Sequence, residues 1–225
     1  MSEKKTKYLD VNDEMLSYER KYWDANLANV AGVDEAGRGP LAGPVVVASV
    51  VFTDYSHIPL VNDSKKLSAK KRYILRDLIL STPGVYYKII EISPEEIDKV
   101  NILQATHSGM RRSVLELKDI EIDVVLIDGL PVPNYPLKSE SIVKGDAKSA
   151  TIAAASILAK TFRDDIMKKY AEIYPEYGFE QHSGYGTVKH LAALNKYGIT
   201  PIHRKSFAPV RNIFDPPLLE QGELF

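Results

Sequence analysis

The 225-residue chain contains no cysteine. This absence excludes a disulfide framework, a thiolate metal site and a cysteine nucleophile, and it is consistent with a reducing compartment. Long apolar runs are also absent, because the two longest stretches, residues 45–52 and 150–159, are too short to cross a bilayer. Residues 1–10 are charged and lack the apolar segment of a signal peptide. The sequence therefore predicts a cytoplasmic protein without membrane association.

The chain also has no excess charge of either sign, since 29 lysines and arginines face 30 aspartates and glutamates. A net charge of −1 does not by itself indicate nucleic-acid binding, so a phosphate backbone would require a local basic surface. Residues 178–211 are a candidate for that surface, because five lysines and arginines there face one glutamate. Residues 212–225 form an acidic tail. Ordinary solvated surface explains the same charges, and the sequence leaves both explanations open.

Hydrophobic periodicity predicts an α/β fold. Residues 30–34 and 44–52 are expected to pair as a hairpin around a glycine-rich turn. Further strands are predicted at residues 85–92, 124–127 and 142–143, and helices at 13–29, 68–80, 101–117, 147–169 and 187–197, with a capping-box helix start at 93–96. The long helix begins with small residues suited to lying close on a sheet. Three consecutive strands, followed by strands that alternate with helices, indicate a mixed sheet with helices on its faces.

Four carboxylates follow predicted strands and are candidates for chemistry. Asp34 and Glu35 end the first strand, Asp128 ends the apolar run 124–127, and Asp146 precedes the long helix. A charge at the end of an apolar strand is costly unless it is paired or bound to a metal. Oxygen ligands without cysteine or paired histidines favour Mg²⁺ or Mn²⁺ over zinc. Two such ions would suit phosphodiester hydrolysis, because they stabilise both the attacking and the leaving oxygen.

Each carboxylate also has a simpler structural explanation. Asp146 is well placed to cap the helix that follows it, and Asp128 to form a turn. Adjacent residues of a regular strand point to opposite faces, so Asp34 and Glu35 would need a local distortion to reach one site. The glycines after them make such a distortion possible.

The sequence also excludes two other classes of protein, the P-loop phosphate-binding proteins and the serine hydrolases. The spacing of Gly32 and Gly37 fits a phosphate-binding P-loop, but Arg38 and Gly39 stand where that motif needs lysine and then serine or threonine. A serine hydrolase is excluded because the chain has no Gly-x-Ser-x-Gly motif.

Seven motifs, in order between about residues 30 and 210, resemble bacterial ribonuclease HII. They are VDEAGRG at 33–39, NDSKKLS at 62–68, IDG at 127–129, KGD at 144–146, the segment 153–160 with 163–164, GY at 184–185 and HRKSF at 203–207. The resemblance implies an RNase H-like mixed five-stranded sheet flanked by helices, with a small C-terminal helical appendage. It also implies an endonuclease that hydrolyses the RNA strand of RNA–DNA hybrids and cuts 5′ of ribonucleotides embedded in duplex DNA.

The resemblance further implies the roles of individual residues. Asp34, Glu35, Asp128 and Asp146 become the catalytic and metal-binding residues for two Mg²⁺ or Mn²⁺ ions. The segment Gly37-Arg38-Gly39 is expected to recognise the ribonucleotide together with Tyr185. This agrees with physical expectation, because distinguishing RNA from DNA requires contact with the 2′-hydroxyl, and a glycine backbone approaches a sugar closely. Six basic residues are further candidates for phosphate contacts: Lys65, Lys144, Lys148, Lys160, Arg163 and Arg204.

Four regions are predicted along the chain. They are an N-terminal helical extension (1–29), an RNase H-like catalytic domain (30–170), a C-terminal helical substrate-binding region (171–211) and the acidic tail (212–225). Within the tail, Gln221, Leu224 and Phe225 resemble the peptide by which bacterial replication and repair proteins bind the sliding clamp. The alternative for these residues is an acidic tail that binds no partner. For the whole chain, the alternatives are a non-catalytic hybrid-binding protein and a DNA integrase or resolvase on the same fold.

Overall fold

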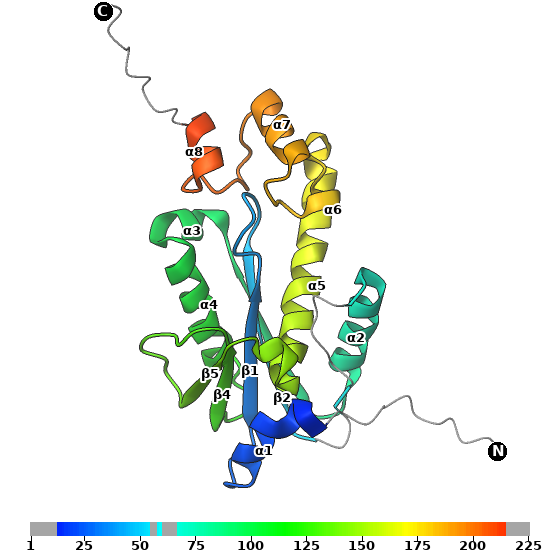
Figure 1. Ribbon diagram of the computed structural model, residues 1–225, viewed down its shortest axis with the longest axis vertical. Coiled ribbons are helices and arrows are strands. Elements are labelled where there is room, and N and C mark those ends of the chain that lie inside the picture. The colour runs from blue at the N-terminus through cyan, green and yellow to red at the C-terminus, as the bar shows by residue number, and fades with distance from the viewer. Residues whose placement is uncertain (1–12, 55–57, 60–66, 215–225) are drawn as a thin grey trace, which may run out of the picture.

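The computed structural model describes residues 13–54, 58–59 and 67–214 of the chain (Figure 1). Five strands form one sheet in the order β3-β2-β1-β4-β5. Their bounds are β1 Val30–Ala36, β2 Val45–Phe52, β3 Val85–Ile92, β4 Val124–Asp128 and β5 Ser139–Ile142. The pairs β1–β2 and β2–β3 are antiparallel, whereas β1–β4 and β4–β5 are parallel. The predicted mixed five-stranded sheet is therefore confirmed.

Helices cover both faces of this sheet (Figure 1). On one face, α5 (Ala150–Ile173) packs on β1 and β2, and α2 (Ala69–Ser81) packs on α5. On the other, α4 (Ile102–Leu115) packs on β1, β2 and β3, after the short α3 (Pro94–Val100). This cover explains why every residue of β2 and nearly every residue of β1 is buried, since a strand with helices on both faces has no solvated side.

The remaining elements lie at the ends of the chain and around the sheet. They are the 3₁₀ turns η1 Asp13–Leu16, η4 Gly145–Ala147 and η5 Pro175–Tyr177, and the helices α1 Ser17–Trp23, α6 Phe179–His182, α7 Val188–Tyr197 and α8 Ala208–Phe214. No helix among the described residues is long and apolar enough to cross a bilayer.

Serine and threonine side chains set the starts of several helices. The hydroxyl of Ser68 accepts from the backbone N–H of Lys71, and that of Ser93 accepts from Glu96. Both helix starts are the ones that the sequence predicts, because a side-chain acceptor satisfies an N–H that has no partner within the helix. Ser149 caps α5 in the same way, so Asp146 is not the cap of that helix.

The predicted helix 13–29 is shorter, because a 3₁₀ turn forms its start and α1 ends at Trp23, and the four-residue helix α6 was not predicted. Three further elements also differ from the predictions. Strand β5 ends at Ile142 and begins at Ser139, where the alternating polar sequence hides an edge strand. The long helix starts three residues later than predicted, because Lys144 is left-handed (φ 58°) and residues 145–147 form a 3₁₀ turn. Helix α8 was not predicted, since its seven residues are too few to show a helical period.

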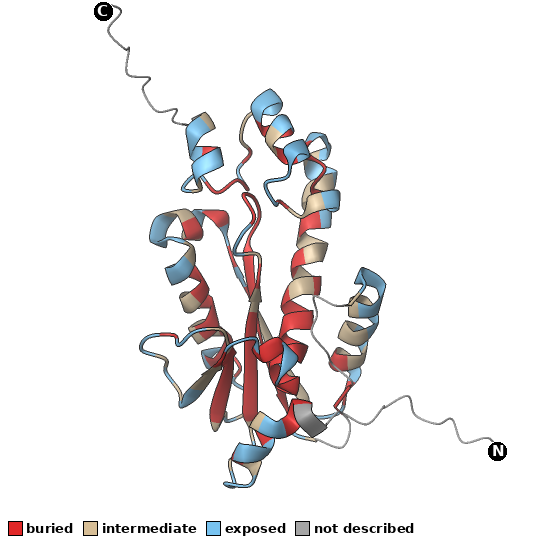
Figure 2. Cartoon of the chain, viewed as in Figure 1, coloured by how far each residue is buried: buried red, intermediate tan, exposed pale blue. Residues whose placement is uncertain are grey.

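Helix α5 lies unusually close to β1. A Cβ atom built on Gly32 would fall less than 3.0 Å from backbone atoms of Thr151 and Ile152. The small residues in the first half of α5 permit this approach, as predicted, and that half is buried, whereas the second half alternates between buried, partly buried and exposed residues (Figure 2). The distance between β1 and α5 is thus set by contact between two backbones.

The first half of α5 packs in the apolar core against β1 and β2, and its C-terminal end belongs to a second apolar cluster. Met167 packs there with Tyr177, Phe179, Leu194 and other residues of the C-terminal elements. The predicted domain boundary after residue 170 therefore falls inside a helix, which continues to Ile173 and joins both clusters. The division into four regions remains a prediction.

Candidate active site

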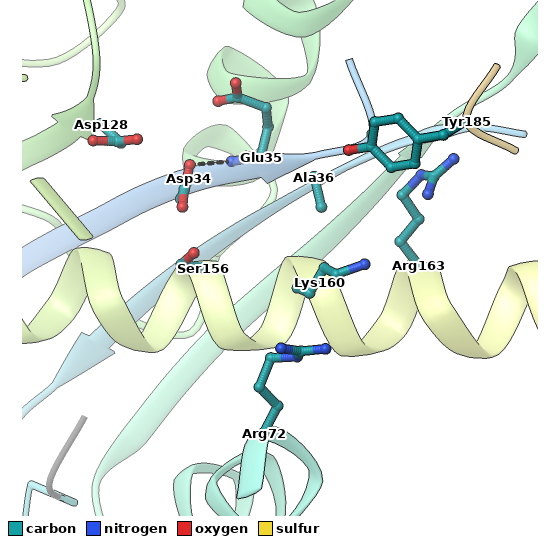
Figure 3. A pocket seen from close by; sticks show the side chains of 10 residues that line it. Asp34, Glu35, Ala36, Arg72, Asp128, Ser156, Lys160, Arg163 and Tyr185 are labelled. Atoms are coloured by element: carbon teal, nitrogen blue, oxygen red, sulfur yellow. Dashed lines mark hydrogen bonds between the residues drawn. The ribbon is translucent and has the colours of Figure 1, made fainter. Parts of the chain in front are cut away.

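A cavity of about 260 Å³ opens where β1 and β4 end (Figure 3). Strands β1 and β4 are parallel, and Val33 pairs with Ile127. The next residue of each strand, Asp34 and Asp128, therefore lies at the same edge of the sheet. The lining residues come from β1, β4, α2, α5 and two loops: Asp34, Glu35, Ala36, Gly37, Arg72, Asp128, Ser156, Lys160, Arg163 and Tyr185.

Strand β1 stays regular through the site. Its pairing with β2 continues without a bulge as far as Ala36 and Val46, so the expected distortion after Asp34 is absent. Asp34 points toward Ser156 on α5, whereas Glu35 points away from that helix (Figure 3). Both carboxylates nevertheless line the cavity.

The carboxyl group of Asp34 is strongly perturbed. Only 4% of Asp34 is exposed, and this burial raises its pKa well above the usual range. The neighbouring carboxylates of Glu35 and Asp128 raise the pKa further, while hydrogen bonds from Ser156 and from the Glu35 N–H (2.7 Å) act in the opposite direction. A cluster of this kind favours a bound cation, because a positive ion offsets the repulsion between carboxylates.

We expect Asp34→Asn to raise thermal stability when divalent cations are removed. An aspartate whose pKa is raised by folding costs free energy at any pH above its unfolded pKa, and asparagine removes this cost at pH 7. In EDTA the melting temperature should rise, measured by calorimetry. The exposed Asp119→Asn is the matched control and should leave it unchanged. A variant that melts below the wild type in EDTA would contradict the repulsion argument.

Asp146 is next to the cavity but does not line it. The Gly145 N–H donates to Asp128 Oδ1 at 2.6 Å, which holds the turn η4 against the end of β4. Asp146 follows in this turn and is 2% exposed. The structure thus brings three of the four predicted carboxylates into one cavity and places the fourth one residue from a hydrogen bond to Asp128.

The donor set fits a hard divalent cation. Carboxylate oxygens are the ligands that Mg²⁺ and Mn²⁺ prefer, and Mg²⁺ commonly binds one or two carboxylates and keeps several waters. Among the described residues, no three histidine, aspartate or glutamate side chains converge closely enough to enclose an ion. An ion in this cavity would therefore complete its coordination with water or phosphate oxygens.

Two buried arginines hold the loop 37–44 that follows β1. Arg204 donates to the carbonyls of Gly37 (2.6 Å), Arg38 (2.9 Å) and Gly43 (3.0 and 2.8 Å). Arg163 donates from Nε to Pro44 O at 2.9 Å and from Nη2 to two further carbonyls. The glycine at 37 has φ 97° and leaves the space that the Arg163 side chain fills.

This geometry corrects the phosphate role predicted for Arg163 and Arg204. They are 1% and 0% exposed, and their N–H groups are directed to backbone carbonyls instead of solvent. Burial lowers the pKa of Arg163 to about 10 and that of Arg204 to about 9, so both remain charged at neutral pH. The sequence does not show this, because a basic residue in a motif looks the same whether it is buried or exposed.

Tyr185 lies beside the same loop. Its ring lines the cavity and is 49% exposed, and a Cβ built on Gly39 would lie 3.4 Å from Tyr185 Cε1. The preceding residue, Gly184, accepts a hydrogen bond from the Leu41 N–H at 2.8 Å. The predicted ribonucleotide-recognition residues are therefore neighbours in space, although about 145 positions separate them in the sequence.

The other predicted bases are spread around the site. Lys160 lines the cavity and donates to Asp164 Oδ1 at 2.6 Å. Lys144 and Lys148 are exposed on either side of the turn η4. Arg38 is exposed, does not line the cavity, and pairs with Glu35 at 3.3 Å. Lys65 lies outside the described residues.

Two polar residues that line the cavity, Arg72 and Ser156, were not predicted from the sequence. Arg72 reaches the cavity from the first turn of α2, directly after the 62–68 motif, and this adjacency was the available signal. Ser156 is the one hydroxyl within the motif segment 153–160, and it lies among alanines that pack on the sheet.

Carboxylates at the ends of β1 and β4, on this mixed sheet and beside a glycine-rich loop, define a metal-dependent nuclease site of the RNase H-like class. Residues 31–210 match the ribonuclease HII family. A ribonuclease HII of Endomicrobium trichonymphae is 53% identical over 200 residues, which cover 88% of this chain and 94% of that protein.

Solved structures agree with the sequence comparisons. Ribonuclease H2 from Pyrococcus horikoshii is 28% identical with a TM-score of 0.72, covering 82% of this chain and 96% of the other. The ribonuclease HII of the PCNA complex from Archaeoglobus fulgidus is 27% identical with a TM-score of 0.69, covering 80% and 95%. The chain belongs to the ribonuclease HII family. It is a ribonuclease H, an endonuclease that acts on RNA–DNA hybrids.

Proposed function

We propose that this enzyme also cuts on the 5′ side of single ribonucleotides embedded in duplex DNA and thereby serves ribonucleotide excision repair. One observation carries the proposal: a single cavity joins the carboxylates Asp34, Glu35 and Asp128 to the glycine loop and Tyr185. The carboxylates that would support hydrolysis thus lie close enough to the glycine loop and Tyr185 for both sets of residues to act on the same nucleotide.

Recognition in this proposal depends on the backbone of residues 37–39. The glycine at 39 lets the main chain approach a 2′-hydroxyl, which is the group that distinguishes RNA from DNA, whereas the glycine at 37 makes room for Arg163 and so shapes the loop. The guanidinium of Arg204 fixes the Gly37 and Arg38 carbonyls and so prevents the loop from adapting to a deoxyribose. The half-exposed ring of Tyr185 is available to stack on the adjoining deoxyribose.

Cleavage breaks the bond between phosphorus and the 3′-oxygen, leaving a 3′-hydroxyl and a 5′-phosphate. Asp34, Glu35, Asp128 and Asp146 would hold two Mg²⁺ or Mn²⁺ ions, which when bound supply activation of water and stabilisation of the leaving oxygen. Lys160 and Arg72 place positive charge on the same cavity wall and orient the phosphate backbone. Lys144 and Lys148 extend this basic surface past the turn η4.

A cleavage assay on three duplexes tests the proposed activity. We expect a duplex with one ribonucleotide to be cut on its 5′ side in Mg²⁺ or Mn²⁺, and a long hybrid to be cut along its RNA strand. An all-DNA duplex should stay intact, and EDTA should stop both reactions. Binding without cleavage would support the non-catalytic alternative, and cutting of the all-DNA duplex would support an integrase or resolvase.

We expect Tyr185→Ala to reduce cutting at a single ribonucleotide about 10- to 100-fold, because one aromatic stacking contact is lost. Affinity for a long hybrid should change by less than about threefold, since phosphate contacts dominate it. Tyr185→Phe is the matched control, because it keeps the ring and should retain most activity. Equal losses of binding and cleavage on all substrates would instead make Tyr185 an ordinary affinity residue.

We further propose that the C-terminal peptide binds the sliding clamp. Gln221, Leu224 and Phe225 lie outside the described residues, so the support comes from the resemblance of this peptide and from the similarity to a ribonuclease HII solved as a complex with PCNA.

A further inference from the structure

We propose that His203 and His190 form a hydrogen-bonded chain that positions Tyr185, and that this chain sets the selectivity for a single ribonucleotide. The inference rests on the proposed recognition role of Tyr185. Neither histidine lines the cavity, so both act through Tyr185 and are positioning residues, not catalytic ones.

Four contacts join the two rings to each other, to Thr200 and to the backbone of Tyr185. His203 Nδ1 receives the Thr200 N–H at 2.9 Å and lies 2.8 Å from Thr200 Oγ1. The Nε2 atoms of His203 and His190 are 3.1 Å apart. His190 Nδ1 lies 2.9 Å from the carbonyl oxygen of Tyr185. The chain therefore runs from Thr200 through both imidazoles to Tyr185.

The end groups fix which nitrogen carries each proton. A backbone N–H can only donate, so His203 Nδ1 must accept from Thr200, and a neutral His203 then carries its proton on Nε2. That proton is donated to His190 Nε2, which leaves the His190 proton on Nδ1. A carbonyl can only accept, and His190 Nδ1–H donates to Tyr185 O. With two neutral rings, this is the one arrangement that satisfies every contact.

Burial keeps both rings neutral. His190 and His203 are 0% and 1% exposed, and burial lowers the pKa of His190 and lowers that of His203 to about 4. The rings of Tyr177 and Phe179 pack against both histidines, and the His182 ring stacks on His190 at 4.7 Å. These surrounding rings restrict the rotation of both imidazoles.

Contacts around Tyr185 transmit this position to the glycine loop. The Tyr185 carbonyl also accepts from the Thr187 N–H at 2.8 Å, and Leu41 of the loop donates to Gly184 O. Arg204, the residue after His203, donates from its N–H to Leu41 O at 2.9 Å. The tyrosine and the loop that faces it are thus fixed to the same segment, residues 203–204.

Two matched variants of His190 separate positioning from packing. The amide nitrogen of asparagine falls near the position of Nδ1, so His190→Asn retains a donor for the Tyr185 carbonyl. The longer glutamine places its amide near Nε2, so His190→Gln can meet His203 but not Tyr185. Both variants replace a buried ring with a neutral amide, and their melting temperatures serve to match them for stability.

The measured quantity is the ratio of kcat/KM on a duplex with one ribonucleotide to kcat/KM on a long RNA–DNA hybrid. We expect His190→Gln to lower this ratio about 3- to 10-fold, as the loss of one hydrogen bond predicts, and His190→Asn to stay within about twofold of the wild type. Equal ratios for the two variants would overturn the proposal.

Nuclear magnetic resonance of the wild type tests the chain without any substitution. Long-range ¹H–¹⁵N spectra at pH 7.5 should show His190 with its proton on Nδ1 and His203 with its proton on Nε2. His190 protonated on Nε2 would overturn the proposal even if the variants fail to fold. If the wild type does not cut at a single ribonucleotide, the proposed function fails, whereas unchanged selectivity in an active His190→Gln enzyme rejects the histidine chain alone.

Discussion

Replacing Asp34 or Asp128 with asparagine is expected to lower kcat for hybrid cleavage by at least about 10³-fold in Mg²⁺. Each substitution removes one negative charge from the group that would hold the ions, and an amide is a weaker ligand for a hard cation. The asparagine side chain has nearly the same size and shape as that of aspartate, so the cavity should retain its shape. Single-turnover cleavage of a labelled hybrid measures the effect.

Binding of the same hybrid in EDTA should change by less than about threefold, because it depends on phosphate contacts that neither variant removes. Asp119→Asn is the control for a charge change, since Asp119 is exposed in the segment that leads into the amino end of β4, opposite Asp128. Near wild-type cleavage by either active-site variant would show that the ions are held elsewhere.

Gly32→Ala is expected to have the largest effect on stability. The added Cβ would fall less than 3.0 Å from backbone atoms of Thr151 and Ile152, and a backbone cannot rotate away as a side chain can. Helix α5 would have to move off β1, at a cost of about 3 kcal/mol or more. The melting temperature should fall by roughly 6–12 °C, which calorimetry would detect.

Gly39→Ala provides the comparison for this variant. Its Cβ would meet nothing closer than Tyr185 Cε1 at 3.4 Å, which is an ordinary contact, so the melting temperature should change little. If Gly32→Ala and Gly39→Ala proved equally stable, α5 would have to be free to shift on the sheet, which would contradict the close packing of the two backbones.

Local signals predicted much of this fold. Strand β3 spans the predicted residues 85–92, and the caps Ser68 and Ser93 begin helices where a side-chain acceptor was recognised. The carboxylates could be grouped because a charge at the end of an apolar strand is costly unless it is paired or bound to a metal. These features depend on neighbours in the sequence, or on the sheet topology that the order of elements implies.

Features that depend on distant contacts could not be predicted in this way. The sequence of β5, Ser-Glu-Ser-Ile, shows no strand pattern of its own. It forms a strand because it pairs with the apolar strand β4. Arg163 and Arg204 are buried because segments 119 and 161 positions away provide their carbonyl partners. The cavity that both Asp34 and Glu35 line likewise arises only when the elements assemble.

The two buried arginines also shape the electrostatic field of the enzyme. Neither guanidinium is exposed, yet both carry charge at neutral pH, and Arg163 forms part of the cavity wall. Mobile salt ions cannot approach a buried charge closely, so its field is screened less than that of a surface lysine. Each guanidinium therefore adds a positive contribution at the cavity that salt weakens little, and it partly offsets the negative charge of Asp34, Glu35 and Asp128 without a direct phosphate contact.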